Sequence, residues 1–259
     1  MKNSNSWKPS KYVLTKHGLR ASRDKTEVAP GSWFVADILA GVYERALKTH
    51  ARGVLLDLGC GKVPLYQVYK DYVSDNICVD WKNTFHKNAY LDFECDLNTG
   101  VPLPDQQFDT ILVTDLMEHI LNPDIVWKDI ARLLKPRGRI IMGVPFFYWI
   151  HEEPYDYFRY TEYKLRSFCD NNGLIVLELT RYGGLLEVIL NIIAKLVKFS
   201  VIISKLHLSI SKILVKSYIG RWMFKKTSAK YPLGYCLVAQ KKYRCFRISI
   251  IPMNFLIPN

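Results

Sequence analysis

Short apolar runs alternate with amphipathic helical patterns through the first two-thirds of the chain. The runs end in turn at Asp57, Asp80, Asp96, Asp115 and Pro145. Between them, residues 32–49 and 123–138 repeat apolar positions at the spacing of an α-helix. Strands that alternate with helices are typical of a parallel sheet with helices on both faces. The pattern therefore predicts an α/β, doubly wound fold.

The last third of the chain departs from this alternation. Residues 161–184 predict one more helix and strand, and residues 233–242 predict a strand that comes about fifty residues later. These patterns also set the expected domain boundaries. We expect an N-terminal cap segment and helix at 1–50, a ligand-binding core at 51–184, a helical insertion at 185–230, the last core strand at 231–247 and an apolar tail at 248–259.

A glycine turn follows the first predicted core strand, in the segment "VLLDLGCGKVPLY" at residues 54–66. Gly59 and Gly61 let backbone amides approach a ligand closely. In an open α/β sheet, ligands bind at the carboxyl ends of the strands, where Asp57 and the other acidic strand ends would lie. Asp80 is placed to accept hydrogen bonds from a ribose diol. The remaining sides of the site are expected to come from Asp96, Leu97, Thr114 and Asp115.

Four segments carry a family resemblance: "LLDLGCG", "ICVDW", "CDLNTGVPLPDQQFDTILVTDLMEHI" and "IARLLKPRGRIIMGVP". Together they resemble the motifs of class I S-adenosylmethionine-dependent methyltransferases of the type 11 group, which also includes ubiquinone-biosynthesis enzymes. The resemblance implies a Rossmann-like, seven-stranded, mostly parallel sheet whose last strand is antiparallel. It also implies S-adenosylmethionine as the cofactor. The predicted cofactor-binding residues are Asp57, Gly59, Gly61, Asp80, Trp81, Asp96, Leu97, Thr114, Asp115 and His119.

The glycine turn departs from the commoner family pattern D-x-G-x-G-x-G. Val63 occupies the third glycine position, and Pro64 follows it. A dinucleotide pyrophosphate needs close backbone approach at a helix N-terminus, whereas S-adenosylmethionine has no phosphate. The loss of this glycine therefore argues against a nicotinamide dinucleotide more strongly than against S-adenosylmethionine.

The segment "FFYWIHEEPYDYFRYT" at residues 146–161 offers the best source of a catalytic base. We predict His151, Asp156 and Tyr157 as catalytic residues, with His151 first because its ordinary pKa lies near neutral pH. Glu152 is an alternative base, and a purely structural His151, bonded to a neighbouring carboxylate, is an equal alternative. For His119 and its neighbour Glu118 we expect a positioning role. The cysteines and histidines lack zinc-site spacing, so no metal site is expected.

The net charge of +12 is concentrated in the last third of the chain. Residues 1–180 have 22 Lys+Arg and 23 Asp+Glu, whereas residues 181–259 have 14 and 1. On a single helical wheel, one arc gathers Glu187, Lys195, Lys198, Lys205, Lys212 and Lys216, and the remaining circumference is apolar. Residues 185–226 are therefore predicted to contact an anionic membrane surface through their lysines. Packing against the chain's own domain, or in a homodimer, is the alternative.

Nucleic acid is a less favoured partner, because the lysines border an apolar helix that lacks a stacking platform. The N-terminus lacks a secretion signal, and no apolar run reaches the roughly 18 residues of a spanning helix, so a cytoplasmic protein is expected. The predicted function is methyl transfer to oxygen of a glycan or lipid-linked intermediate at the inner membrane surface. The alternatives are a quinone or natural-product acceptor, RNA, and a membrane-peripheral binding protein without catalysis.

Overall fold

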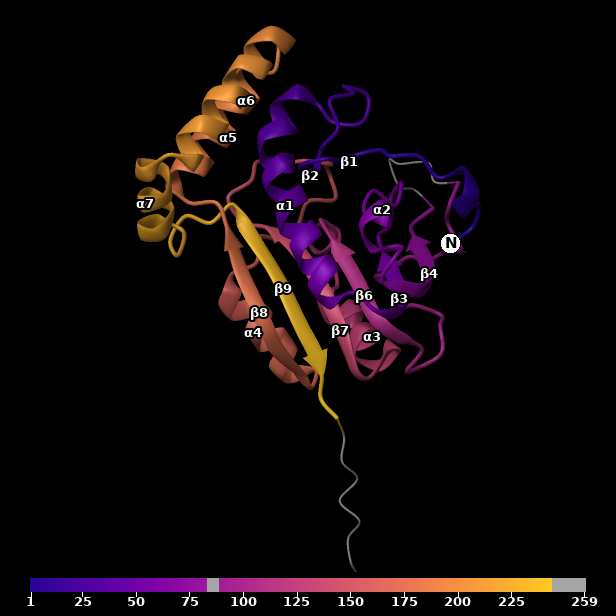
Figure 1. Ribbon diagram of the computed structural model, residues 1–259. Coiled ribbons are helices and arrows are strands. Elements are labelled where there is room, and N and C mark those ends of the chain that lie inside the picture. Colours follow the sequence, from indigo (N-terminus) through magenta and orange to yellow (C-terminus); the bar gives the residue numbers. More distant parts are fainter. Residues whose placement is uncertain (83–88, 244–259) are drawn as a thin grey trace, which may run out of the picture.

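The computed structural model describes residues 1–82 and 89–243, and its centre is a seven-stranded sheet in the order β5-β4-β3-β6-β7-β9-β8 (Figure 1). The strands are β3 (Gly53–Leu58), β4 (Val73–Asp80), β5 (Phe93–Glu94), β6 (Phe108–Thr114), β7 (Leu134–Pro145), β8 (Leu174–Tyr182) and β9 (Gly234–Lys241). Strand β9 runs antiparallel to both β7 and β8, while the pairs from β5 to β7 are parallel. The predicted mostly parallel sheet with an antiparallel last strand is confirmed.

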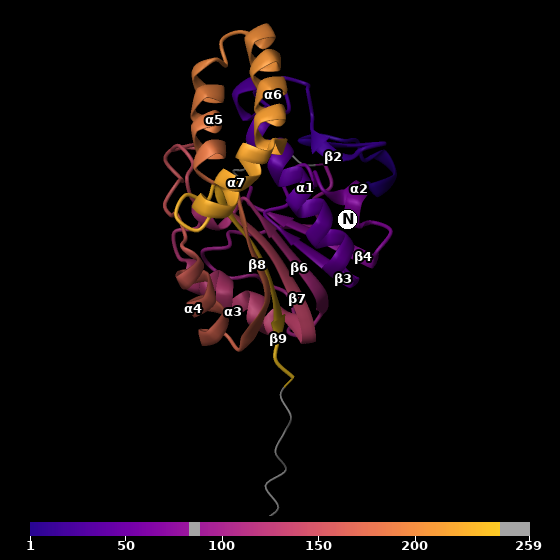
Figure 2. The same ribbon diagram turned by 60° about the vertical axis from the view of Figure 1, so that its left-hand side comes forward.

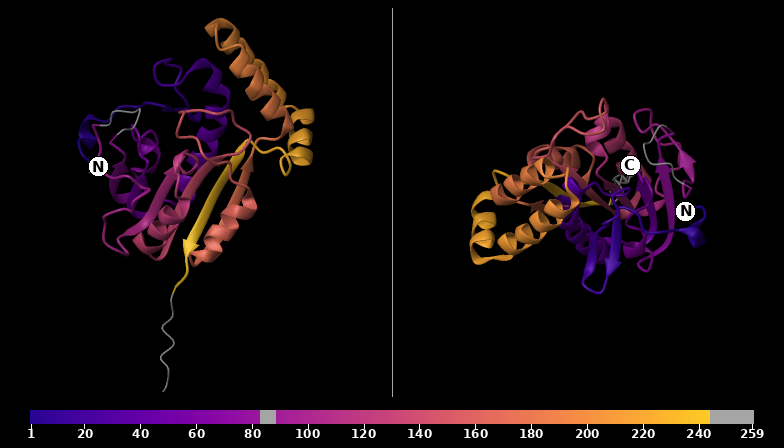
Figure 3. Two further views of the ribbon diagram at one scale, coloured as in Figure 1. Left: turned by 180° about the vertical axis from the view of Figure 1, so that it is seen from behind. Right: turned by 90° about the horizontal axis from the view of Figure 1, so that it is seen from above.

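Helices cover both faces of this sheet because its strands are apolar on both sides (Figure 3). Leu55 belongs to the core cluster under α1 (Trp33–His50), whereas its neighbour Leu56 belongs to the cluster under α3 (Pro123–Leu133). The helix α4 (Glu162–Asn171) covers the edge at β8, and the short α2 (Tyr66–Tyr69) follows the glycine turn. Strand order reverses beside β3, so the carboxyl ends of β3 and β6 diverge into a crevice.

The N-terminal segment forms a small separate sheet on top of α1. Strands β1 (Tyr12–Thr15) and β2 (Gly18–Ala21) pair antiparallel, and β2 packs against α1. Three short 3₁₀ turns complete the N-terminal region and the crevice: η1 (Ser4–Ser6), η2 (Pro30–Ser32) and η3 (Met117–His119). The segment before α1 therefore lies beside the carboxyl ends of the core strands.

The helical insertion is three helices instead of the one continuous helix assumed for its lysine arc. They are α5 (Leu185–Leu196), α6 (Val201–Lys216) and α7 (Tyr218–Thr227) (Figure 2). The break falls before Ser200, whose side chain accepts a hydrogen bond from the Ile203 amide and so starts a new helix. Ser217 caps α7 in the same way, through the Gly220 amide.

Part of the polar arc of the insertion faces the body of the protein, whereas Lys198, Lys205, Lys212 and Lys216 are exposed, and the membrane contact stays a prediction. Lys195 is buried, as are Glu187 and Asn191 on α5 and Ser204 and Ser211 on α6. The described helices include none that is both long and apolar enough to cross a bilayer. The predicted tail at 248–259, and the end of the 231–247 segment, lie outside the described residues.

Candidate active site

A cavity of about 760 Å³ lies at the carboxyl ends of β3, β4, β6 and β7. Every predicted cofactor-binding residue lines it, as do His151 and Tyr157. Asp156 is the exception among the predicted site residues, because it lies behind His151 and lines a separate shallow depression. The tertiary structure thus brings residues from positions 57 to 157 to one end of the sheet.

The glycine turn at one end of this cavity has a left-handed backbone at three alternate positions. Gly59 has φ +69°, and Gly61 and Val63 follow with 49° and 51°. A Cβ at Gly59 would lie 2.6 Å from the Leu116 side chain, so only glycine fits there. Val63 keeps the conformation of the missing third glycine even though it is β-branched, a strained arrangement. Its side chain is fully buried, and its carbonyl accepts a hydrogen bond from Trp7 at 3.1 Å.

Two buried carboxyl groups stand at the ends of β3 and β4. The Asp80 carboxylate accepts hydrogen bonds of 2.7 Å from the amides of Gly61 and Trp81, which fixes its orientation at the turn. Burial, together with the nearby charge of Asp80, raises the pKa of Asp57 to about 8. Asp57 is therefore largely protonated at neutral pH.

Asp115 is held by residues that the sequence did not single out. Lys11 approaches it at 2.7 Å, and the Tyr43 hydroxyl donates to its other oxygen at 2.7 Å. Burial opposes the charges of both partners, but the attraction within the pair outweighs it, so the pKa of Lys11 is raised and that of Asp115 is lowered. Gly143 makes this possible, because any Cβ there would overlap the Tyr43 ring. Both Asp115 oxygens are thus already engaged within the protein.

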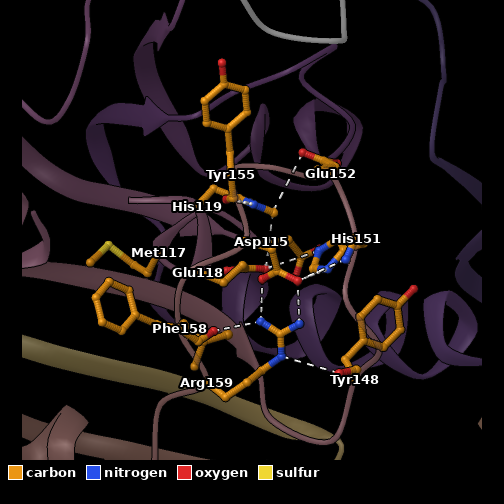
Figure 4. A network of polar contacts seen from close by, with 12 residues as sticks. Asp115, Met117, Glu118, His119, Tyr148, His151, Glu152, Tyr155, Phe158 and Arg159 are labelled. Atoms are coloured by element: carbon orange, nitrogen blue, oxygen red, sulfur yellow. Dashed lines mark hydrogen bonds and ion pairs between the residues drawn. The ribbon is translucent and has the colours of Figure 1, made fainter. Parts of the chain in front are cut away.

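His151 is oriented by the residues behind it (Figure 4). Its Nδ1 lies 3.1 Å from the Asp156 carboxylate, which also accepts from the His151 amide at 2.9 Å. Arg159 donates to both Asp156 oxygens, at 2.5 and 2.7 Å. Burial disfavours the Asp156 charge, but these hydrogen bonds outweigh it and lower the pKa of Asp156. Burial and the neighbouring His119 ring lower the pKa of His151, so its ring is neutral at neutral pH.

Glu118 lies beneath His151 and was underestimated from the sequence. Its side chain is 1% exposed, and neither carboxyl oxygen has a hydrogen-bond partner among the described residues. Burial and the Asp115 charge raise its pKa, so that it carries a proton. Ligand atoms of Glu118, His119 and His151 lie within 4.8 Å of one another, a donor set that a divalent cation accepts. Spacing along the sequence could not indicate it, because His151 is far from the other two.

His119 is fixed in turn by the loop that follows β7. Its Nδ1 lies 2.8 Å from the Tyr155 carbonyl oxygen, and its ring stands edge-on to His151 with centroids 4.8 Å apart. The amides of Tyr157 and Phe158 both donate to the Glu118 carbonyl oxygen. The loop after β7 is therefore tied to the segment after β6, and Tyr157 reaches the cavity wall.

The comparisons with known proteins agree with this fold and cavity. Residues 56–142 match the family model described as "Methyltransferase domain". A curated relative, the ubiquinone biosynthesis O-methyltransferase of Parvibaculum lavamentivorans, is 24% identical over 112 residues. That match covers 40% of this chain, and the chain spans only 44% of the relative's length.

Solved structures with the same fold have low sequence identity to this chain. The [4+2]-cyclase SpnF has a TM-score of 0.52 at 16% identity, with 82% of this chain and 83% of that chain covered. Phosphoethanolamine N-methyltransferase 2 of Haemonchus contortus, in complex with S-adenosyl-L-methionine, has a TM-score of 0.51 at 16% identity, with 86% and 59% covered. These likenesses establish the fold, and a cyclase among them illustrates that a fold does not fix a reaction.

The cavity suits S-adenosylmethionine on its own evidence. The left-handed turn lines the cavity with backbone, the amide-oriented Asp80 would accept hydrogen bonds from a ribose diol, and apolar Leu97 and Ile120 would offer a surface for a flat base. The Asp80 carboxylate leaves this end of the cavity negatively charged, which disfavours phosphate and does not disfavour a sulfonium. The fold, the motif order and the family match over residues 56–142 converge on an S-adenosylmethionine-dependent methyltransferase domain with a Rossmann-like fold.

Proposed function

We propose that this protein transfers the methyl group of S-adenosylmethionine to a hydroxyl oxygen, with His151 as the general base. The observation that carries this proposal is the bond between His151 Nδ1 and Asp156. An Nδ1–H that donates to a carboxylate leaves Nε2 with its lone pair, ready to accept a proton. His151 lines the cavity and the Asp156 carboxylate does not, so His151 would touch the acceptor and Asp156 would position it.

The chemistry needs little more than alignment and proton removal. S-adenosylmethionine supplies an electrophilic methyl carbon, and the acceptor oxygen bonds to it as the carbon–sulfur bond breaks, which yields S-adenosylhomocysteine and a methyl ether. His151 Nε2 takes the proton of the acceptor hydroxyl. A general base of this kind accelerates a reaction by about 10²-fold to 10⁴-fold. Tyr148, Trp149 and Tyr155 line the acceptor side and would exclude water from it.

For the acceptor we propose a glycan or a lipid-linked intermediate at a membrane surface. Aromatic side chains suit the flat faces of sugar rings, and an exposed apolar surface on the insertion supports a membrane setting. The name of the curated relative supports an oxygen acceptor and makes a quinone-like phenol the second candidate. The same His151 base would serve either hydroxyl.

The decisive experiment follows transfer of a labelled methyl group from S-adenosylmethionine into membrane extracts, purified glycans and phenolic quinone precursors. The His151→Ala enzyme should lose about 10² to 10⁴ in rate and keep its affinity for S-adenosylhomocysteine by calorimetry. His17→Ala, an exposed histidine in the β1–β2 turn, is the matched control and should retain full rate. Turnover above half of wild type in His151→Ala would remove His151 from the mechanism.

Further measurements separate the proposed roles. Because the neutral ring is the active form and the pKa of His151 is lowered, kcat/KM should fall only below about pH 6.5, the ordinary histidine value. Asp156→Asn should lower the rate while leaving the affinity for S-adenosylhomocysteine unchanged. Tight S-adenosylhomocysteine binding without transfer to any acceptor class would favour the binding-protein alternative.

A further inference from the structure

The three helices of the insertion turn large apolar side chains to the outside. We call this the apolar face and define it by the exposed residues Ile189, Ile192, Ile193, Leu196, Phe199, Ile202, Ile203, Leu206, Ile210, Ile213, Leu214, Tyr218, Ile219, Trp222 and Phe224. Phe199 and Ile202 are about four-fifths exposed, at 79% and 80%. Scattered exposed apolar residues are ordinary, but fifteen of them between residues 189 and 224 indicate an interaction surface.

Polar contacts hold the opposite side of the insertion against the body. Lys195 donates to the hydroxyls of Ser32 and Tyr148, at 2.8 and 2.9 Å, and Lys212 pairs with Asp37 at 2.7 Å. Both α5 and α6 contact η2 and α1. Gly31 of η2 allows this close approach, since a Cβ added there would lie 3.0 Å from the Lys198 Cβ and 3.1 Å from the Ala194 carbonyl oxygen. These polar contacts therefore anchor α5 and α6, which stand beside α1 (Figures 1 and 2), while the residues of the apolar face stay exposed.

Positive charge borders the apolar face without any counterbalancing acid. From residue 188 onward the sequence contains no Asp or Glu. Exposed Lys205, Lys216, Lys225 and Lys226 lie on the same helices as the apolar side chains. A second copy of this chain docked on the same face would bring these cations together, which costs energy. An anionic surface would attract them.

The position of the apolar face also bears on what covers it. Strand β9 starts beside α7 and ends at Lys241, at the opposite end of the sheet from α5 and α6 (Figure 1). The insertion flanks the cavity, because Lys195 and Lys198 lie 4.7 and 4.9 Å from the ring of Trp149, a cavity-lining residue. Whatever the apolar face contacts is therefore held next to the acceptor side of the cavity.

From these observations we infer that the apolar face lies in the interface of an anionic lipid bilayer, with the helices parallel to its surface. Apolar side chains enter the acyl boundary, and Lys205, Lys216, Lys225 and Lys226 contact lipid phosphates. The inference deepens the membrane setting of the proposed function, and binding to lipid does not require that the reaction proposed above be correct. It would present the cavity to acceptors that are anchored in the same bilayer.

The test is flotation of the full chain with vesicles of phosphatidylcholine alone or of an equal mixture of phosphatidylcholine and phosphatidylglycerol, at low and high salt. Wild type should float with the anionic vesicles and detach as salt rises. Replacing three exposed apolar residues together, Ile202→Gln, Leu206→Gln and Ile213→Gln, should weaken partitioning by about 10³-fold. Replacing Lys205, Lys225 and Lys226 by Gln should weaken it by about 10²-fold on anionic vesicles only.

Matched controls remove similar groups elsewhere on the surface. Tyr163→Gln with Ile175→Gln removes exposed apolar side chains, and Lys16, Lys70 and Lys128 changed together to Gln remove the same charge. Both controls should float like wild type, and calorimetry with S-adenosylhomocysteine should show that every variant is folded. Wild type that stays in solution with anionic vesicles at low salt would overturn the inference. So would lipid-free dimers that the apolar-face substitutions dissociate, because the face would then join two copies.

Discussion

The cavity end of the sheet and the helical insertion contain similarly apolar sequence, yet they place polar groups in opposite ways. In the core, apolar side chains of β3 and β6 are buried between the helices, and acidic groups gather at the strand ends. In the insertion, Glu187 and Lys195 of the polar arc are buried against the body, while many large apolar side chains are exposed. This difference is the basis for the two partners that we propose, a polar ligand for the cavity and a lipid surface for the insertion. Three substitutions sharpen this contrast.

The largest effect is expected at the polar end of the cavity. Asp80→Ala removes a carboxylate that the amides of Gly61 and Trp81 orient. We expect this carboxylate to accept two charge-assisted hydrogen bonds from the ribose diol of the cofactor. Binding should weaken by about 2 to 4 kcal/mol, a factor of roughly 30 to 1,000. Calorimetry with S-adenosylhomocysteine measures it, and exposed Asp71→Asn serves as the control. Unchanged affinity in a folded Asp80→Ala protein would remove Asp80 from the site.

A smaller effect, on stability, is expected at Asp57. Its pKa is about 8 in the folded protein and about 3.9 when unfolded, so the unfolded state loses its proton first as pH rises. The folded state is thus penalised progressively between about pH 4 and pH 8. Asp57→Asn should remove this dependence on pH. The gain in the free energy of unfolding over wild type should therefore be about 1 to 3 kcal/mol larger at pH 8 than at pH 5. Urea denaturation at both values tests it; the same pH slope as wild type would contradict it.

The smallest effect is expected where the two regions meet, at Lys195. Its pKa is lowered by burial, and its described polar partners are the hydroxyls of Ser32 and Tyr148. Lys195→Met should change the free energy of unfolding by less than about 1 kcal/mol, because the lost hydrogen bonds are offset by the lost cost of burying a charge. The loop that bears His151 would be less fixed, and the methyl-transfer rate should fall by about threefold to tenfold.

The control for Lys195→Met is Lys198→Met. Lys198 is an exposed lysine whose ammonium group also lies over the ring of Trp149. It should leave both the stability and the rate close to wild type. Equal rate losses in the two variants would show that the aromatic contact, and not the buried hydrogen bonds, positions the loop.

The strand ends of the core could be found without coordinates. Apolar runs end at Asp57, Asp80 and Asp115, and two glycines follow the first of them. Because the carboxyl ends of parallel strands lie at one edge of the sheet, this pattern predicts that a ligand binds at that edge. What surrounds those groups could not be found in this way. Lys11 reaches Asp115 across 104 residues, and His151 reaches Glu118 only through the turn after β7. Neither contact leaves a periodic signal in the sequence.

The sequence by itself determined the sheet, the glycine turn, the acidic strand ends and the polar arc of the insertion, because each depends on local periodicity or on residue type. Only the tertiary structure decided which face of the insertion helices packs against the body of the protein. Helical spacing shows that a helix has two faces, but the hydroxyls of Ser32 and Tyr148 and the carboxylate of Asp37 attract its polar side to the body. Those partners lie far away in the chain, so the exposed apolar face is a property of the fold.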